Sequence, residues 1–79
     1  MQIQVQLYAT LRDFSPDGSK NEPFNVELNG GETLRHVLNK LQLPEKIPKI
    51  MLVNGRHRKE DEELKEGDNV GIFPPLAGG

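Results

Sequence analysis

Residues 2–8 read QIQVQLY, so that apolar side chains alternate with glutamines over the whole stretch. Because successive side chains of a β-strand point to opposite faces, this period of two predicts a strand with one buried face. A second alternating run predicts another strand, antiparallel to the first, with Phe24, Val26 and Leu28 on its buried face. The connection between the two strands is rich in turn-forming residues, and residues 11–14 are expected to form a short helical turn in it.

The segment after these two strands has the pattern of an amphipathic helix. Its apolar stripe, at positions i, i+3, i+4 and i+7, consists of Leu34, Val37, Leu38 and Leu41. Thr33 is a suitable N-cap residue, and Pro44 is expected to end the helix. A helix of this length covers one face of a small sheet, which predicts an α+β fold.

A hairpin is expected after the helix. Residues 50–53 form an apolar run that ends at Asn54-Gly55, the residue pair that most favours a two-residue hairpin turn. Residues 56–59 would then form a short polar return strand. The acidic run at residues 60–63 is expected to be a solvated loop.

The last strand is expected to point Val70 and Ile72 inward. It cannot continue into the two prolines at positions 74–75, because proline donates no hydrogen bond to a neighbouring strand. We therefore expect one folded domain over residues 1–73 and a flexible C-terminal tail over residues 74–79.

The resulting element order, β-β-α-β-(β)-β, predicts a β-grasp (ubiquitin-like) fold, in which a mixed sheet packs on one main helix. A ferredoxin-like sandwich would need a second amphipathic helix, and the sequence contains none of adequate length. In the β-grasp topology the first and last strands form a parallel central pair. That pairing follows from the topology and not from the periodicity.

Charge and composition exclude several classes of function. The 79 residues include 10 Lys and Arg against 12 Asp and Glu, scattered along the chain, which argues against nucleic acid as a partner. No apolar run approaches the roughly 20 residues that cross a bilayer, so we expect a cytoplasmic protein with no membrane partner. There is no cysteine, and the two histidines, His36 and His57, have no ligand-spaced neighbours. We therefore expect neither a metal site nor an enzyme.

The C-terminal tail is the most informative feature. After Phe73 it reads Pro74, Pro75, Leu76, Ala77, Gly78 and Gly79. The prolines separate the tail from the last strand, so the terminal carboxylate projects on a tether of roughly 20 Å. The glycines at its tip have no side chains, which lets the chain thread a narrow partner site. The alternative is a frayed terminus without a function.

Four segments resemble the MoaD/ThiS family of ubiquitin-like sulfur carriers. They read IQVQLYATLR at the start, LVNG at the hairpin, LKEGDNV before the last strand, and FPPLAGG at the end. The FPPxxGG ending is more similar to the branch of the molybdopterin synthase small subunit than to the thiamine carriers. The chain departs from the family pattern in its short helix-to-strand region and in the polar residues at 56–58.

The resemblance implies a carrier that works through Gly79. In this family a ubiquitin-activating-type enzyme uses Mg-ATP to adenylate the C-terminal carboxylate, and a persulfide sulfur from a sulfur-donating enzyme then displaces AMP. The resulting thiocarboxylate donates sulfur in the synthesis of molybdopterin, the organic part of the molybdenum or tungsten cofactor, with a synthase large subunit as a further partner. The chain has no glycine-rich loop followed by Lys and Ser or Thr, so we expect it to bind no cofactor and ATP to lie on the partner.

Three alternatives stay open at this point. The chain could be a thiamine-type sulfur carrier, or a ubiquitin-like modifier that is joined to protein lysines through Gly79. It could also be a β-grasp interaction module with an inert tail. The carrier and the modifier share the adenylation step and differ only in what happens afterwards.

Strand parity predicts a partner-docking patch on the exposed face of the sheet. If the alternate residues of the first and last strands face the helix, Tyr8 and Phe73 point outward as neighbours, and exposed aromatic side chains favour partner contacts. Leu52 joins them if its apolar run has the right register. The resemblance adds Arg12, at a position where the family carries an arginine that contacts partners. The alternative is that Tyr8 only covers strand ends.

Overall fold

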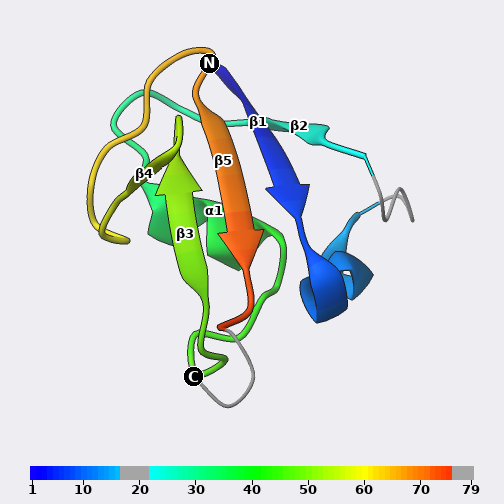
Figure 1. Cartoon of the computed structure of the whole chain (residues 1–79). Helices are drawn as coiled ribbons and strands as arrows, with labels where there is room; N and C mark the ends of the chain where they lie inside the picture. Colours follow the sequence, from blue (N-terminus) through cyan, green and yellow to red (C-terminus); the bar gives the residue numbers. More distant parts are fainter. Residues whose placement is uncertain (17–21, 76–79) are drawn as a thin grey trace.

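The computed structural model of the chain describes residues 1–16 and 22–75, which form one mixed sheet and one α-helix (Figure 1). The strands are β1 (Gln2–Leu7), β2 (Phe24–Glu27), β3 (Ile50–Val53), β4 (Arg56–His57) and β5 (Asn69–Phe73). Their order in the sheet is β2-β1-β5-β3-β4, and β1 and β5 are parallel. The other neighbouring strands are antiparallel. This arrangement confirms the β-grasp prediction, including the parallel pair.

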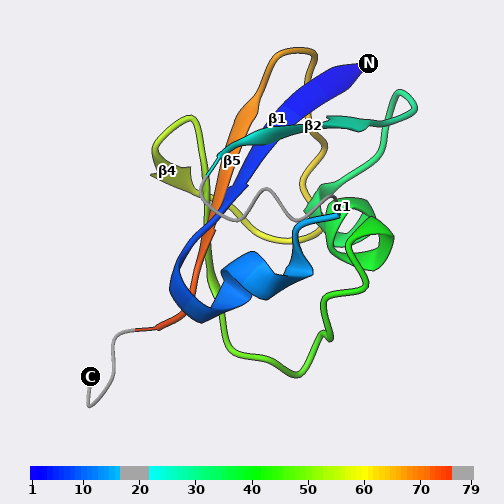
Figure 2. The same cartoon turned by 90° about the vertical axis from the view of Figure 1, so that its right-hand side faces the viewer.

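One face of the sheet is covered by helix α1 (Leu34–Lys40), and a 3-10 helix, η1 (Ala9–Phe14), follows β1. Seen from the side, α1 lies on one side of the sheet, and no described helix lies on the other (Figure 2). Within the described residues no helix combines the length and the hydropathy needed to cross a membrane. The face of the sheet opposite α1 is therefore covered by no described helix.

The core lies between the sheet and α1, where the predicted alternation is confirmed. Val5 of β1 pairs with Val70 of β5, and Leu7 pairs with Ile72, so that both pairs point toward the helix. The buried apolar side chains of the described residues are Ile3, Val5, Leu7, Leu11, Phe24, Val26, Leu28, Leu34, Val37, Leu38, Leu41, Leu43, Val53, Leu64, Val70 and Ile72. Burial of this apolar set is the main term that stabilises the fold.

Helix α1 begins at the predicted N-cap, Thr33. The Nδ1 atom of His36 accepts a hydrogen bond from the backbone N–H of Thr33 at 3.0 Å. His36 thus occupies the place that Glu or Gln holds in the usual capping box. The ring is exposed and serves the helix terminus, which gives this histidine a structural role.

The predicted helix end at Pro44 is wrong, because α1 ends at Lys40. Gln42 adopts a left-handed backbone conformation with φ of 57°. The N–H of Leu43 then donates to the carbonyl of Leu38 at 3.0 Å, and the N–H of Gln42 donates to that of Asn39 at 3.0 Å. This is a Schellman motif, in which glycine is usual at the left-handed position. The motif buries Leu43 beside Leu38, which offsets the strain at Gln42.

The hairpin turn is confirmed, with positive φ angles of 52° at Asn54 and 83° at Gly55. The return strand is shorter than the predicted residues 56–59, since β4 contains only Arg56–His57. The side chain of Asn54 holds the turn against the start of β5, because its Oδ1 accepts from the N–H of Asn69 and its Nδ2 donates to Asp68, both at 3.0 Å.

The acidic run at residues 60–63 is a loop, as predicted, with Asp61 and Glu63 exposed, but its backbone is held against the start of α1. The carbonyl of Glu60 accepts the N–H of Arg35 at 3.0 Å, and Glu63 forms an antiparallel bridge with Thr33. The first N–H groups of a helix have no partner within it, so the loop supplies one. Leu64, which is buried, anchors the loop directly after the acidic run. The run therefore lies along the N-terminal end of α1.

Candidate functional site

The tail leaves the sheet at the end of β5. This strand ends at Phe73, and Pro74 and Pro75 lie outside the sheet, as their missing N–H groups predicted. The remaining predicted tail residues, Leu76, Ala77, Gly78 and Gly79, lie outside the described residues. The structure therefore shows the point from which the tail departs, and the division into domain and tail stays a prediction.

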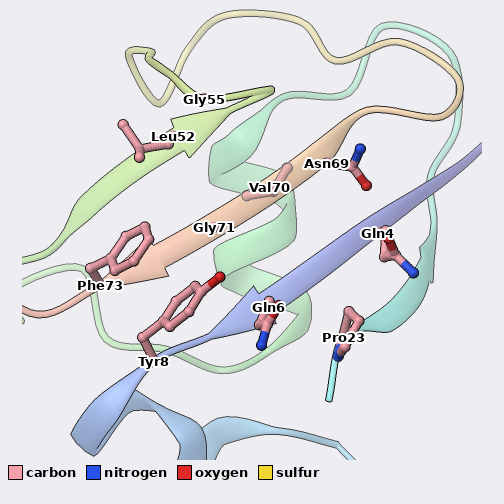
Figure 3. Close-up of a pocket in the computed structure, with 10 residues that line it drawn as sticks. All are labelled: Gln4, Gln6, Tyr8, Pro23, Leu52, Gly55, Asn69, Val70, Gly71 and Phe73. Atoms are coloured by element: carbon pink, nitrogen blue, oxygen red, sulfur yellow. The ribbon is translucent and has the colours of Figure 1, made fainter. Parts of the chain in front are cut away.

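Two aromatic side chains stand beside that point. The rings of Tyr8 and Phe73 stack with centroids 4.1 Å apart and an interplanar angle of 7° (Figure 3). The N–H of Tyr8 also donates to the carbonyl of Ile72 at 3.1 Å, which continues the pairing of the two central strands. Both side chains are half-buried, on the sheet face away from α1. The structure thus brings together the two residues that parity placed on one face.

Leu52 belongs to the same face. Its neighbour Val53 is buried against the core and pairs with Val70, whereas Leu52 pairs with Gly71 and is half-buried. Because side chains alternate along a strand, Leu52 points away from the helix. This register was ambiguous in the sequence, and the structure places Leu52 as expected.

A shallow hollow of about 430 Å³ lies on this face (Figure 3). It is lined by Gln4, Gln6, Tyr8, Pro23, Leu52, Gly55, Asn69, Val70, Gly71 and Phe73. None of these residue types is charged, and amides accompany the apolar and aromatic groups. We call Tyr8, Leu52 and Phe73 the sheet-face patch. Its role in docking stays a prediction.

Arg12 is not part of this hollow. It lies in η1, where its Nε donates to the carbonyl of Ala9 at 3.0 Å, and its side chain is exposed. Arg12 therefore does not line the hollow together with Tyr8, Leu52 and Phe73. A partner that touches both Arg12 and the sheet-face patch would have to reach from the sheet face to the 3-10 helix.

His57 and Gly71 were not singled out as residues of this face in the sequence analysis. His57 pairs with Leu52 across β3 and β4, so it lies on the same face at the sheet edge. Gly71 lies beneath the aromatic pair, where a Cβ atom would stand 3.1 Å from Cε1 of Phe73 and 3.5 Å from Cε2 of Tyr8. A glycine between apolar strand residues is the available signal for such a close approach.

The two histidines lie apart, one at the N-terminal end of α1 and one on β4. In residues 1–16 and 22–75, no group of three His, Asp or Glu side chains gathers as around a metal ion. The features of the described surface that bear on function are therefore the sheet-face patch and the point at which the tail leaves β5.

Comparison with known proteins places this geometry in a family. The ThiS family model matches residues 5–79. The putative molybdopterin converting factor subunit 1 from Pyrococcus furiosus is similar to this chain with 27% sequence identity and a TM-score of 0.78, over 96% of this chain and 99% of that one. No curated protein sequence matches the chain.

Two further solved structures share the fold at lower identity. Small archaeal modifier protein 1 of H. volcanii has 20% identity and a TM-score of 0.76, over 95% of this chain and 98% of that one. A chain in the complex of subunits 1 and 2 of the molybdopterin-converting factor from Helicobacter pylori has 22% identity and a TM-score of 0.64, over 100% of both chains. Since the family model extends over nearly the whole sequence and through the Gly-Gly tail, the chain belongs to the ThiS family.

Proposed function

We propose that this protein is a sulfur carrier for molybdopterin biosynthesis, and that the C-terminal carboxyl group of Gly79 carries the sulfur. The observation that supports this most directly is the ending FPPLAGG, which leaves the sheet at Phe73 and lies inside the ThiS match. The Pyrococcus furiosus relative is described as a putative molybdopterin converting factor subunit 1. That description favours molybdopterin over thiamine as the pathway.

The chemistry begins at the terminal carboxylate. This group is ionised at neutral pH and is a poor electrophile, so it must first receive a leaving group. A carboxylate oxygen attacks the α-phosphorus of ATP and pyrophosphate leaves, which gives an acyl-adenylate. A persulfide sulfur then attacks the acyl carbon and AMP leaves. Cleavage of the remaining sulfur–sulfur bond by a thiol leaves the thiocarboxylate on Gly79.

In this proposal the partners perform every chemical step. A ubiquitin-activating-type enzyme binds Mg-ATP, a persulfide enzyme donates the sulfur, and a synthase large subunit consumes it. The large subunit is supported by the Helicobacter pylori structure, which is a complex of subunits 1 and 2. The chain itself contributes a rigid sheet that holds the base of the tail, and a face on which partners dock.

The sheet-face patch is expected to contribute directly to partner affinity. Phe73→Ala or Tyr8→Ala should weaken binding to the cognate activating enzyme by about 1–2 kcal/mol or more, because aromatic side chains anchor interfaces. Titration calorimetry with each variant measures this. Phe14→Ala is the control, since Phe14 is a half-buried aromatic residue of η1 outside the hollow. Unchanged affinity with a lower melting temperature would show that the patch only stabilises the fold.

Intact mass spectrometry tests the proposed function. Protein purified from its native organism should include a species heavier by one oxygen-to-sulfur replacement, located in the C-terminal peptide. A modifier would instead appear on immunoblots as bands above the 8.9 kDa monomer that survive boiling and reductant and disappear when Gly79 is deleted. If such bands appear without the sulfur-bearing species, the proposed carrier function is wrong and the protein is a modifier. The name of the H. volcanii neighbour, small archaeal modifier protein 1, would fit that outcome.

A further inference from the structure

A row of residues crosses the exposed sheet face at one level. Gln6 of β1 pairs with Gly71 of β5, Gly71 pairs with Leu52 of β3, and Leu52 pairs with His57 of β4. Paired residues of neighbouring strands place their side chains on the same face. Gly71 therefore leaves an empty place in the middle of this row, between Gln6 and Leu52.

The backbone does not explain why glycine stands there. The glycines of the described residues with positive φ are Gly31, Gly55 and Gly67, and Gly71 is not among them. It lies in a regular strand, where glycine is unfavourable compared with β-branched residues. The reason for glycine is therefore the space that its missing side chain leaves.

That space is taken by the aromatic pair. A Cβ atom at position 71 would stand 3.1 and 3.4 Å from Cε1 and Cζ of Phe73, and 3.5 Å from Cε2 of Tyr8. The first of these distances is shorter than an ordinary contact, so the Phe73 ring would have to shift by a few tenths of an ångström to admit a Cβ atom. Since Phe73 stacks on Tyr8 at 4.1 Å, a shift of one ring disturbs the pair. Gly71 thus leaves room for the Phe73 ring in the position where it stacks on Tyr8.

We propose that Gly71 is a positioning residue of the docking surface, because its missing side chain lets the rings of Tyr8 and Phe73 stack into one continuous aromatic wall. The partner that holds the tail inserts an uncharged apolar side chain against this wall. The inference rests on the proposed function. Phe73 directly precedes the first tail residue, Pro74, so a partner that grips the tail reaches this wall. The hollow beside it has no charged lining residue, and an ionised side chain buried there would lack a counter-ion.

The test compares Gly71→Ala and Gly71→Val with Gly30→Ala. Gly30 has no heavy atom within 4 Å of an added Cβ and no positive φ, so it is the matched control. Tyr8 is the chain's one tyrosine and there is no tryptophan, so the near-UV circular dichroism of tyrosine reports its stacking in the free protein. We expect this signal to change slightly in Gly71→Ala, strongly in Gly71→Val and not at all in Gly30→Ala.

Affinity is then measured against the cognate adenylating enzyme. Gly71→Val should bind about tenfold more weakly, the size of effect expected of a central interface position. Its melting temperature should stay close to that of the wild type, because the better strand propensity of valine offsets the disturbed stacking. The loss should largely disappear when Phe73→Ala is the background, since the two changes act through the same ring.

Each contrary result overturns a different part of the proposal. An unchanged tyrosine signal in Gly71→Val would show that Gly71 does not position the rings, and a changed signal with full affinity would show that the rings do not contact the partner. A wild-type signal that depends on protein concentration would assign the hollow to a second copy of the chain. Failure of the enzyme to adenylate the wild type would overturn the proposed function itself, and with it the proposal that the partner's apolar side chain enters the hollow.

Discussion

Deletion of Gly79 is expected to abolish adenylation by the cognate activating enzyme. The shortened chain still ends in a glycine carboxylate, but that group falls short by about 3.3–3.6 Å, the span of one extended residue. A displacement of about 1 Å from a reactive geometry already costs roughly 100-fold in rate. Pyrophosphate release in the presence of ATP measures the loss, which we expect to be complete.

The fold should not change in this variant. Pro74 and Pro75 lie outside β5 and, as prolines, donate no hydrogen bond to a strand, so we expect thermal unfolding of the shortened protein to match that of the wild type. Gly78→Ala keeps the length of the tail and provides the comparison, with a smaller loss that reflects a methyl group in a narrow channel. Undiminished adenylation after deletion of Gly79 would refute the carrier proposal.

The second large effect is on stability. Ile72→Ala should lower the free energy of unfolding by about 2–5 kcal/mol, as expected when a fully buried isoleucine is truncated. Ile72 is 0% exposed and lies between Leu7 of β1 and Met51 of β3, at the centre of the sheet. A chain of this size has a total stability of about 4–12 kcal/mol, so the variant should melt at least about 8 °C lower.

Phe73→Ala is the matched control for this prediction. Phe73 is the next residue in β5 but points to the opposite face and is half-buried. Calorimetric unfolding of the two variants should therefore show a large loss for Ile72→Ala and a much smaller one for Phe73→Ala. The reverse order would mean that the two faces of β5 have been assigned the wrong way round.

Local rules predicted most of the fold correctly because they depend on neighbours in the chain. The period of two in β1 determined which residues are buried, and Asn54-Gly55 formed the turn that its positive φ angles favour. The same parity placed Tyr8 and Phe73 on one face. The helix end was mispredicted because a Schellman motif, itself a local structure, closes at Gln42 before Pro44 is reached. The bond from the N–H of Arg35 to the carbonyl of Glu60 joins residues 25 positions apart, and no local pattern indicated it.

By itself, then, the sequence determined the strands, the helix, their buried faces and the Gly-Gly ending. Each of these follows from side-chain periodicity, from turn chemistry or from the composition of the tail. Only the tertiary structure decided that Tyr8 stacks on Phe73, that Leu52 and His57 share their face, and that Gly71 makes room for the rings. These contacts depend on the parallel pairing of β1 with β5 and on the register of β3, which join segments from opposite ends of the chain. The alternating pattern determines which face each residue takes, but which residue stands opposite which also depends on the pairing of strands that are distant in the sequence.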